Sequence, residues 1–435
     1  MHDSPLVHVA QLLLILSVIF VAAKIGGEVA RRYLHIPSVL GELLAGILIS
    51  PYAFGGVELF GVGPLIETHN NLPVAEELFF FGQMAVVLLL FEIGLETNRK
   101  QFMSNIKPAT FVAAGGVLLP FILGFGTTVL LGFASVESIE AMIPALFVGT
   151  IMTATSISIT ARVLSDLGRL NSREGVTILG GAVIDDVLGI IILAIVVGIS
   201  QEGSITPMTV TMIVLKALGF WLGLTVIGSF ISTKLSKLAL WFKTPGSPLV
   251  IAIVYGLVAA AIAEVYFGLA MIIGSYTMGL VLSDTDLRHK IEKSVMTINK
   301  IFVPAFFVIV GMQLDLSSFT GTGDKSMFSL VLFAIVLTVL AIFSKMIGSG
   351  LPALLFGFKK KESLRIGLGM VPRGEVALII GGIAITSGVI GSGIFVLLQF
   401  AFFLFVGSLL FIVTDCNLID KNEEISYIIN NYFFI

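Results

Sequence analysis

Apolar runs of about 20 residues recur along almost the whole chain, and the short stretches between them hold most of its charges. A helix of about 20 apolar residues spans the hydrocarbon core of a bilayer. In that environment the backbone has to satisfy its own hydrogen bonds, which strongly limits the folds a spanning chain can adopt. The sequence therefore predicts an all-α polytopic membrane protein.

The composition agrees with this prediction, because 57% of the residues are hydrophobic and only 12% are charged. A soluble domain carries about twice that share of charge.

The net charge is −3, so no basic face indicates a nucleic-acid partner. Cys416 is the only cysteine, which excludes an internal disulfide and a cysteine-based metal site. No basic segment precedes the first apolar run, so we expect a first helix and not a cleaved signal peptide.

The apolar runs predict thirteen membrane-spanning helices. Their approximate boundaries are 7–23, 37–51, 77–96, 108–133, 141–161, 174–199, 207–232, 248–267, 268–283, 301–314, 327–357, 366–386 and 388–414. The loops after odd-numbered helices hold twenty lysines and arginines, whereas those after even-numbered helices hold only Lys325. Basic residues gather on the cytoplasmic side. We therefore expect the N-terminus outside and the C-terminus in the cytoplasm.

Two segments far apart in the chain share a pattern that indicates an internal repeat. Residues 41–50 and 274–283 both read Gly-x4-Gly, then three aliphatic residues and a serine, and the following helices end at Gly94-Leu95-Glu96 and Gly311-Met312-Gln313. Coincidence among small residues is the alternative. The paired helices would cross in opposite directions, which predicts inverted six-helix repeats, common in secondary transporters. The predicted layout is repeat 1 at about 7–199, a linker helix at about 207–232, repeat 2 at about 248–414 and a cytoplasmic tail at 415–435.

The fifth helix of each repeat carries signs of a break. Thr153–Thr160 holds five hydroxyl residues in eight, and Gly367–Glu375 holds three glycines and Pro372, which has no amide donor. Hydroxyl side chains in a membrane helix often only bond back to the preceding turn. The matched positions nevertheless favour two crossed discontinuous helices near the bilayer midplane, where such transporters bind their substrates.

Asp185 and Asp186 lie inside the apolar run from Val176 to Ile199. Carboxylates at membrane depth are costly and usually mark an ion or proton pathway. Consecutive helical residues point about 100° apart, so the two cannot face one ion in the same way. Lys345, in an apolar stretch of the second repeat, is the expected partner of Asp185. The alternative is that Lys345 extends to the interface, but about 21 Å of helix separates it from Lys359–Lys361.

Other charged residues suggest lesser roles. Arg373 and Glu375 lie in the second break, and we expect them to pair or to stabilise exposed helix ends. We expect Glu92 to be solvated, and Glu42 to be a pathway or interface group. The histidines fall at or outside the span ends, so no histidine-based metal site is indicated.

Two further motifs are Phe302–Met312 and the string Gly369-Met-Val-Pro-Arg-Gly-Glu-Val-Ala377. Together with the motifs described above, they resemble the second monovalent cation:proton antiporter family. That family includes bacterial sodium/proton antiporters and glutathione-gated potassium efflux proteins. The resemblance covers roughly residues 7–414. It implies a homodimer with a dimerisation domain and a mobile core, which here would be predicted helices four to six and eleven to thirteen.

The resemblance also implies roles for particular residues. Asp186 matches the carboxylate that binds the cation or the proton, Asp185 the one that pairs with lysine, and Lys345 that lysine. Thr155 and Ser156 would line the site. Unlike the potassium efflux members, the chain shows no nucleotide-binding domain after the last predicted helix, and its paired aspartates resemble the electrogenic sodium/proton branch.

The sequence thus predicts a secondary antiporter, not an enzyme, that exchanges Na⁺ or Li⁺ for H⁺ by alternating access in a prokaryotic plasma membrane. It would use the proton gradient and no cofactor. Potassium/proton exchange by the same fold stays open, because selectivity rests on small differences in site size. A cation channel and a non-transporting ion sensor are the rivals from other classes.

Overall fold

The computed structural model describes residues 5–34, 38–56, 66, 74–202, 207–313, 327–373, 377 and 380. Among them, helices joined by short turns are the only regular structure. The long helices are α1 (Pro5–Val29), α3 (Glu76–Glu96), α5 (Ile106–Leu130), α6 (Ile139–Thr153), α8 (Arg173–Glu202), α9 (Pro207–Trp241), α10 (Ser247–Phe267), α12 (Asp286–Met312) and α13 (Met327–Leu355). Shorter helices are α2 (Ser38–Leu48), α4 (Arg99–Ser104), α7 (Ile157–Asp166), α11 (Met271–Leu282) and α14 (Lys360–Gly369).

Nine segments of this described part are long and apolar enough to cross a membrane, and α2 and α11 are shorter apolar helices. The protein is therefore an all-α polytopic membrane protein. The predicted span 388–414, the tail and most of the second half of 366–386 lie outside the described residues. The count of thirteen consequently stays a prediction.

The sequence-based boundary of the tenth span was wrong. We expected a basic loop before residue 301, but α12 begins at Asp286. Leu287, Ile291 and Val295 recur every four residues and are all buried, so this segment has one apolar helical face although its other faces are charged. The linker helix was also predicted too short, since α9 continues to Trp241 and includes Lys234 and Lys237.

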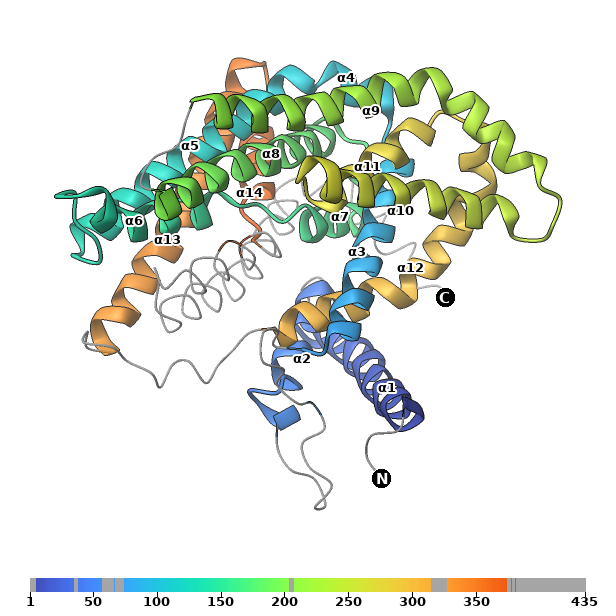
Figure 1. Ribbon diagram of the computed structural model, residues 1–435, viewed down its shortest axis with the longest axis horizontal. Helices are drawn as coiled ribbons and strands as arrows, with labels where there is room; N and C mark the ends of the chain where they lie inside the picture. Colours follow the sequence, from blue (N-terminus) through green and yellow to red (C-terminus); the bar gives the residue numbers. More distant parts are fainter. Residues whose placement is uncertain are drawn as a thin grey trace, which may run out of the picture.

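The helices pack as two bundles (Figure 1). We call the first the core bundle; it consists of α5, α6, α7, α8, α13 and α14. We call the second the flanking bundle; it consists of α1, α2, α3, α9, α10, α11 and α12. Contacts between them are few and involve mainly α7 with α2 and α3, and α8 with α9. The two bundles meet along a seam of these helices, and one cluster of buried apolar side chains, which includes Leu40, Ile157 and Val183, runs across it.

Glycines bring the helices of the flanking bundle together in two matching pairs. A Cβ on Gly46 of α2 would lie 3.0 Å from the Cα of Gly311 on α12, and a Cβ on Gly279 of α11 would lie 3.0 Å from the Cα of Gly94 on α3. In each case the second helix of one predicted repeat packs on the third helix of the other. This reciprocity is the packing expected of an inverted repeat.

Candidate functional site

The first break lies between α6 and α7. Helix α6 ends at Thr153, and Ala154, Thr155 and Ser156 form an extended link to α7. Ser156 begins the second helix as its N-cap, because its hydroxyl accepts a hydrogen bond from the Ile159 amide at 3.3 Å. All three link residues are buried. The hydroxyl-rich segment therefore interrupts a spanning helix, as the sequence predicted.

The second break follows α14 and lies directly beside the first. The Ser156 amide donates a 2.7 Å hydrogen bond to the Pro372 carbonyl. The hydroxyls of Thr155 and Thr160 donate to the carbonyls of Met370 (3.3 Å) and Gly369 (3.0 Å). Backbone groups freed by one break thus find partners in the other, which is how irregular backbone is tolerated at membrane depth.

Lys345 joins α13 to both α8 and the first break. Its Nζ donates to Asp185 Oδ1 at 2.6 Å and to the Thr153 carbonyl at 2.7 Å. The side chains of Lys345 and Asp185 are 0% and 1% exposed, so Lys345 does not extend to the interface. This lysine therefore serves as counter-charge to an acid and as cap to the last carbonyl of α6.

Asp186 and Arg373 complete a buried charge cluster. Each is 2% exposed. Asp186 acts electrostatically on Lys345, and Arg373 on both Lys345 and Asp185. When all four side chains are ionised they carry two negative and two positive charges, so binding of one more monovalent cation or proton changes the charge of the cluster.

The structure brings together most of the side chains that the sequence singled out. Asp185, Asp186 and Lys345 meet near the crossing, Thr155 and Ser156 lie in the first break, and Pro372 and Arg373 lie in the second. Glu375 is outside the described residues, so its predicted pairing with Arg373 stays a prediction. In the described part of the chain, no group of three or more histidine, cysteine or acidic side chains could hold a metal ion.

One acidic residue was misjudged from the sequence. We expected Glu92 to be solvated near the end of α3, but its side chain is partly buried and accepts a hydrogen bond from Asn299 Nδ2 of α12. The length of α12 explains the difference, since the underestimated part of that helix includes Asn299.

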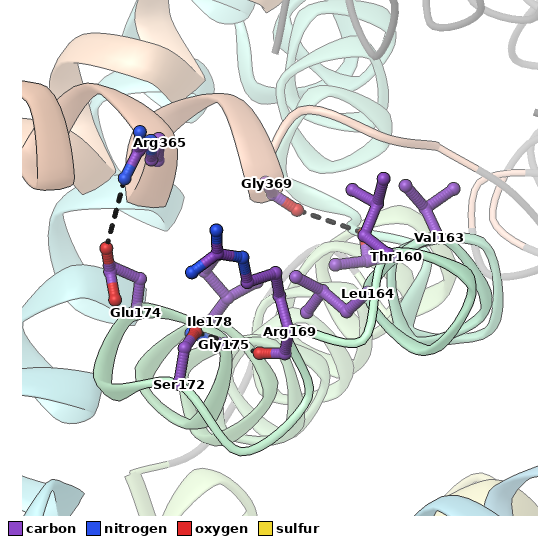
Figure 2. Close-up of a pocket in the computed structure, with 11 residues that line it drawn as sticks. Thr160, Val163, Leu164, Arg169, Ser172, Glu174, Gly175, Ile178, Arg365 and Gly369 are labelled. Carbon is purple, nitrogen blue, oxygen red and sulfur yellow. Dashed lines mark hydrogen bonds and ion pairs between the residues drawn. The ribbon is translucent and has the colours of Figure 1, made fainter. Parts of the chain in front are cut away.

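A cavity of about 70 Å³ lies against the crossing, between α7, the start of α8 and α14 (Figure 2). Thr160 and Gly369, which join the two broken helices, line it, and Arg365 and Glu174 form an ion pair at 3.5 Å in its wall. Sequence reasoning missed this pair. Almost 200 residues separate the two side chains, and only the packing of α14 on α8 brings them together.

Comparisons with known proteins give a consistent result. A family model described as "Sodium/hydrogen exchanger, transmembrane" matches residues 15–415. The chain is 37% identical over 404 residues to the high-affinity Na⁺/H⁺ antiporter NhaS3 of Synechocystis, covering 88% of this chain and 85% of that protein. It is 34% identical to the Na⁺/H⁺-K⁺ antiporter GerN of Bacillus cereus, covering 87% and 89%. The structure resembles the sodium proton antiporter MjNhaP1 of Methanocaldococcus jannaschii with a TM-score of 0.63 at 18% identity, covering 93% and 96%.

Proposed function

The chain belongs to the sodium/hydrogen exchanger family, and from that premise we propose that it is a secondary antiporter that exchanges Na⁺ for H⁺. The observation that carries the proposal is the buried charge cluster at the crossing of two broken helices. Asp186 is the acid that binds either a proton or a dehydrated cation. Asp185 pairs with Lys345 and sets the charge around it.

The chemistry of the crossing supports this assignment. Hard monovalent cations favour oxygen ligands, and the crossing concentrates carboxylates, hydroxyls and backbone carbonyls. A buried carboxylate holds a proton more firmly than a solvated one. Protons and cations therefore compete for Asp186, with Thr155 and Ser156 as further ligands. Movement of the core bundle past the flanking bundle would then carry the occupied site across the membrane.

The wider arrangement belongs to the same proposal. Two inverted six-helix repeats, at about 7–199 and 248–414, are supported by the reciprocal contacts Gly46–Gly311 and Gly94–Gly279. The distribution of lysine and arginine supports an extracellular N-terminus and a cytoplasmic C-terminus. Family resemblance supports a homodimer, and bacterial relatives support a plasma membrane location.

Potassium is the second candidate cation. The relative GerN is named as a Na⁺/H⁺-K⁺ antiporter, at 34% identity over 392 residues. The side chains of the cluster do not distinguish the two ions, because both take the same oxygen ligands.

The test uses the purified protein in proteoliposomes that contain a pH-reporting dye. We expect added Na⁺ to drive proton movement, with an apparent affinity for Na⁺ that improves as the pH rises and then levels off. Parallel additions of Li⁺ and K⁺ give the selectivity. An affinity independent of pH, with flux proportional to concentration, would indicate a channel instead.

A further inference from the structure

One buried hydroxyl on α13 has no hydrogen-bond partner among the described residues. Ser349 is fully buried, and its Oγ makes no hydrogen bond in that part of the chain. Ser344, a buried serine on the same helix, donates its hydroxyl to the Ala341 carbonyl at 3.2 Å. Such bonding to the preceding turn is frequent for hydroxyl side chains in membrane helices. Ser349 differs, and a buried polar group without a partner calls for an explanation.

The Ser349 hydroxyl lies beside the ammonium group of Lys345. The two residues are four positions apart on α13, so their side chains are neighbours on one face of the helix. A Cβ on Gly116 of α5 would overlap Ser349 Oγ and would lie 3.5 Å from Lys345 Nζ. Both polar atoms therefore border the space that the absent side chain of Gly116 leaves where α5 and α13 cross.

Lys345 is able to donate to this oxygen. A lysine ammonium carries three donors. Within the described structure two hydrogen bonds from Nζ are formed, to Asp185 Oδ1 at 2.6 Å and to the Thr153 carbonyl at 2.7 Å. The lysine stem has four flexible carbons. Nζ can consequently turn toward Ser349 while the helices stay in place.

We propose that Ser349 is the acceptor that holds Lys345 when a cation displaces it from Asp185. The inference rests on the proposed binding of Na⁺ at the buried charge cluster. A cation bound at the carboxylates takes over the negative charge that Lys345 faces, and a buried ammonium without a partner is strongly unfavourable. The Ser349 oxygen then accepts a hydrogen bond from the ammonium and replaces the one that was lost. Ser349 is a positioning residue, because it acts on the cation through Lys345.

The proposed contact forms only in the cation-bound state, and this separates it from a packing role. Without Na⁺, removal of the Ser349 hydroxyl eliminates an unsatisfied buried oxygen, so the stability of the protein stays the same or rises. With Na⁺ bound, the same removal leaves Lys345 without its replacement acceptor. The hydroxyl therefore stabilises the cation-bound state selectively, and its loss weakens Na⁺ binding.

The experiment compares Ser349→Ala with the wild type in two measurements at one pH. The first is the apparent Na⁺ affinity of exchange in proteoliposomes, which we expect to fall about tenfold, as for loss of a hydrogen bond to a charged group. The second is the melting temperature in detergent, which should be equal or higher without Na⁺ and should rise less when Na⁺ is added. The matched control is Ser344→Ala, whose hydroxyl bonds within its own helix. This control keeps the wild-type Na⁺ affinity.

Gly116→Ala provides an independent arm. Its methyl group would overlap Ser349 Oγ and forces the hydroxyl out of the space beside Lys345, so we expect a similar loss of Na⁺ affinity. In the double variant with Ser349→Ala this overlap is relieved, and the affinity matches that of Ser349→Ala alone. The control on the same helix is Gly126→Ala, where nothing lies within 4 Å of the added Cβ.

Two results would overturn the inference. One is a wild-type Na⁺ affinity in Ser349→Ala. The other is a melting temperature of that variant that falls equally with and without Na⁺, because a packing role has this effect. Absence of any Na⁺-driven proton movement in the wild type would instead refute the proposed function, on which the inference rests.

Discussion

Lys345 shows how a single side chain can hold together a site made of three helices. It is fully buried, and it bonds Asp185 on α8 and the last carbonyl of α6. A buried ion pair adds little net stability compared with apolar residues, but removal of one partner leaves a charge without compensation. The cost of truncating Lys345 therefore arises mainly from the acid that remains.

Truncation of this lysine should consequently be partly reversible by a second substitution. We expect Lys345→Ala to lower the free energy of unfolding by about 3–5 kcal/mol, measured as a lower melting temperature in detergent. Addition of Asp185→Asn should restore part of the loss, because it removes the unpaired charge. Lys237→Ala, at an exposed position on α9, serves as the control with little effect. Strictly additive losses would show that the two residues do not interact.

Asp186 differs from its neighbour because its expected role is in transport. Asp186→Asn keeps the size of the side chain but removes the charge for which cation and proton compete. We expect this variant to fold and to lose Na⁺-driven proton movement at every pH. The control Asp284→Asn changes an exposed acid and should retain exchange. Appreciable exchange by Asp186→Asn in proteoliposomes would contradict the assignment.

At the scale of helices, close crossings depend on residues without a side chain. Gly348 of α13 approaches α5 so closely that a Cβ there would overlap the Gly115 carbonyl oxygen. Gly348→Ala should therefore destabilise the protein by about 1–3 kcal/mol, seen as a lower melting temperature in detergent. The matched control is Gly219→Ala in α9, where nothing lies within 4 Å of the added Cβ. Equal stability of the two variants would show that the crossing adapts.

The same scale shows what the sequence could predict. Most spans followed from the length of apolar runs, and the α6–α7 break followed from a cluster of hydroxyl residues, because both signals are local. The start of α12 did not follow from such a local signal. Its basic residues suggested a loop, although Leu287, Ile291 and Val295 form an apolar helical face. The Glu174–Arg365 pair and the hydrogen bond between Asn299 and Glu92 depend on how distant helices pack. Local patterns carry no information on such partners.

At the scale of the molecule, the two bundles meet mainly where α7 packs on α2 and α3 and where α8 packs on α9, and one cluster of buried apolar side chains runs across this seam. A relative movement of the bundles would require the side chains of this cluster to slide past one another. The ion pair of Lys345 and Asp185 lies within the core bundle, so it would move as part of it. Whatever these two residues bind or release during that movement contributes to the charge carried across the membrane.

Charge movement is therefore the property of the whole molecule that best tests the role of the pair. If cation binding at Asp186 separates Lys345 from Asp185, two groups change protonation in each cycle, and two protons exchange for one cation. We expect exchange in sealed vesicles to generate a membrane potential, and valinomycin with K⁺ to accelerate it by dissipating that potential. Lys345→Gln removes one titrating group, so its exchange should be electroneutral or absent. Wild-type exchange that does not respond to an imposed potential would rule out the two-proton scheme. Antiport itself would still be compatible with that result, because a single carboxylate at Asp186 is sufficient to exchange one proton for one cation.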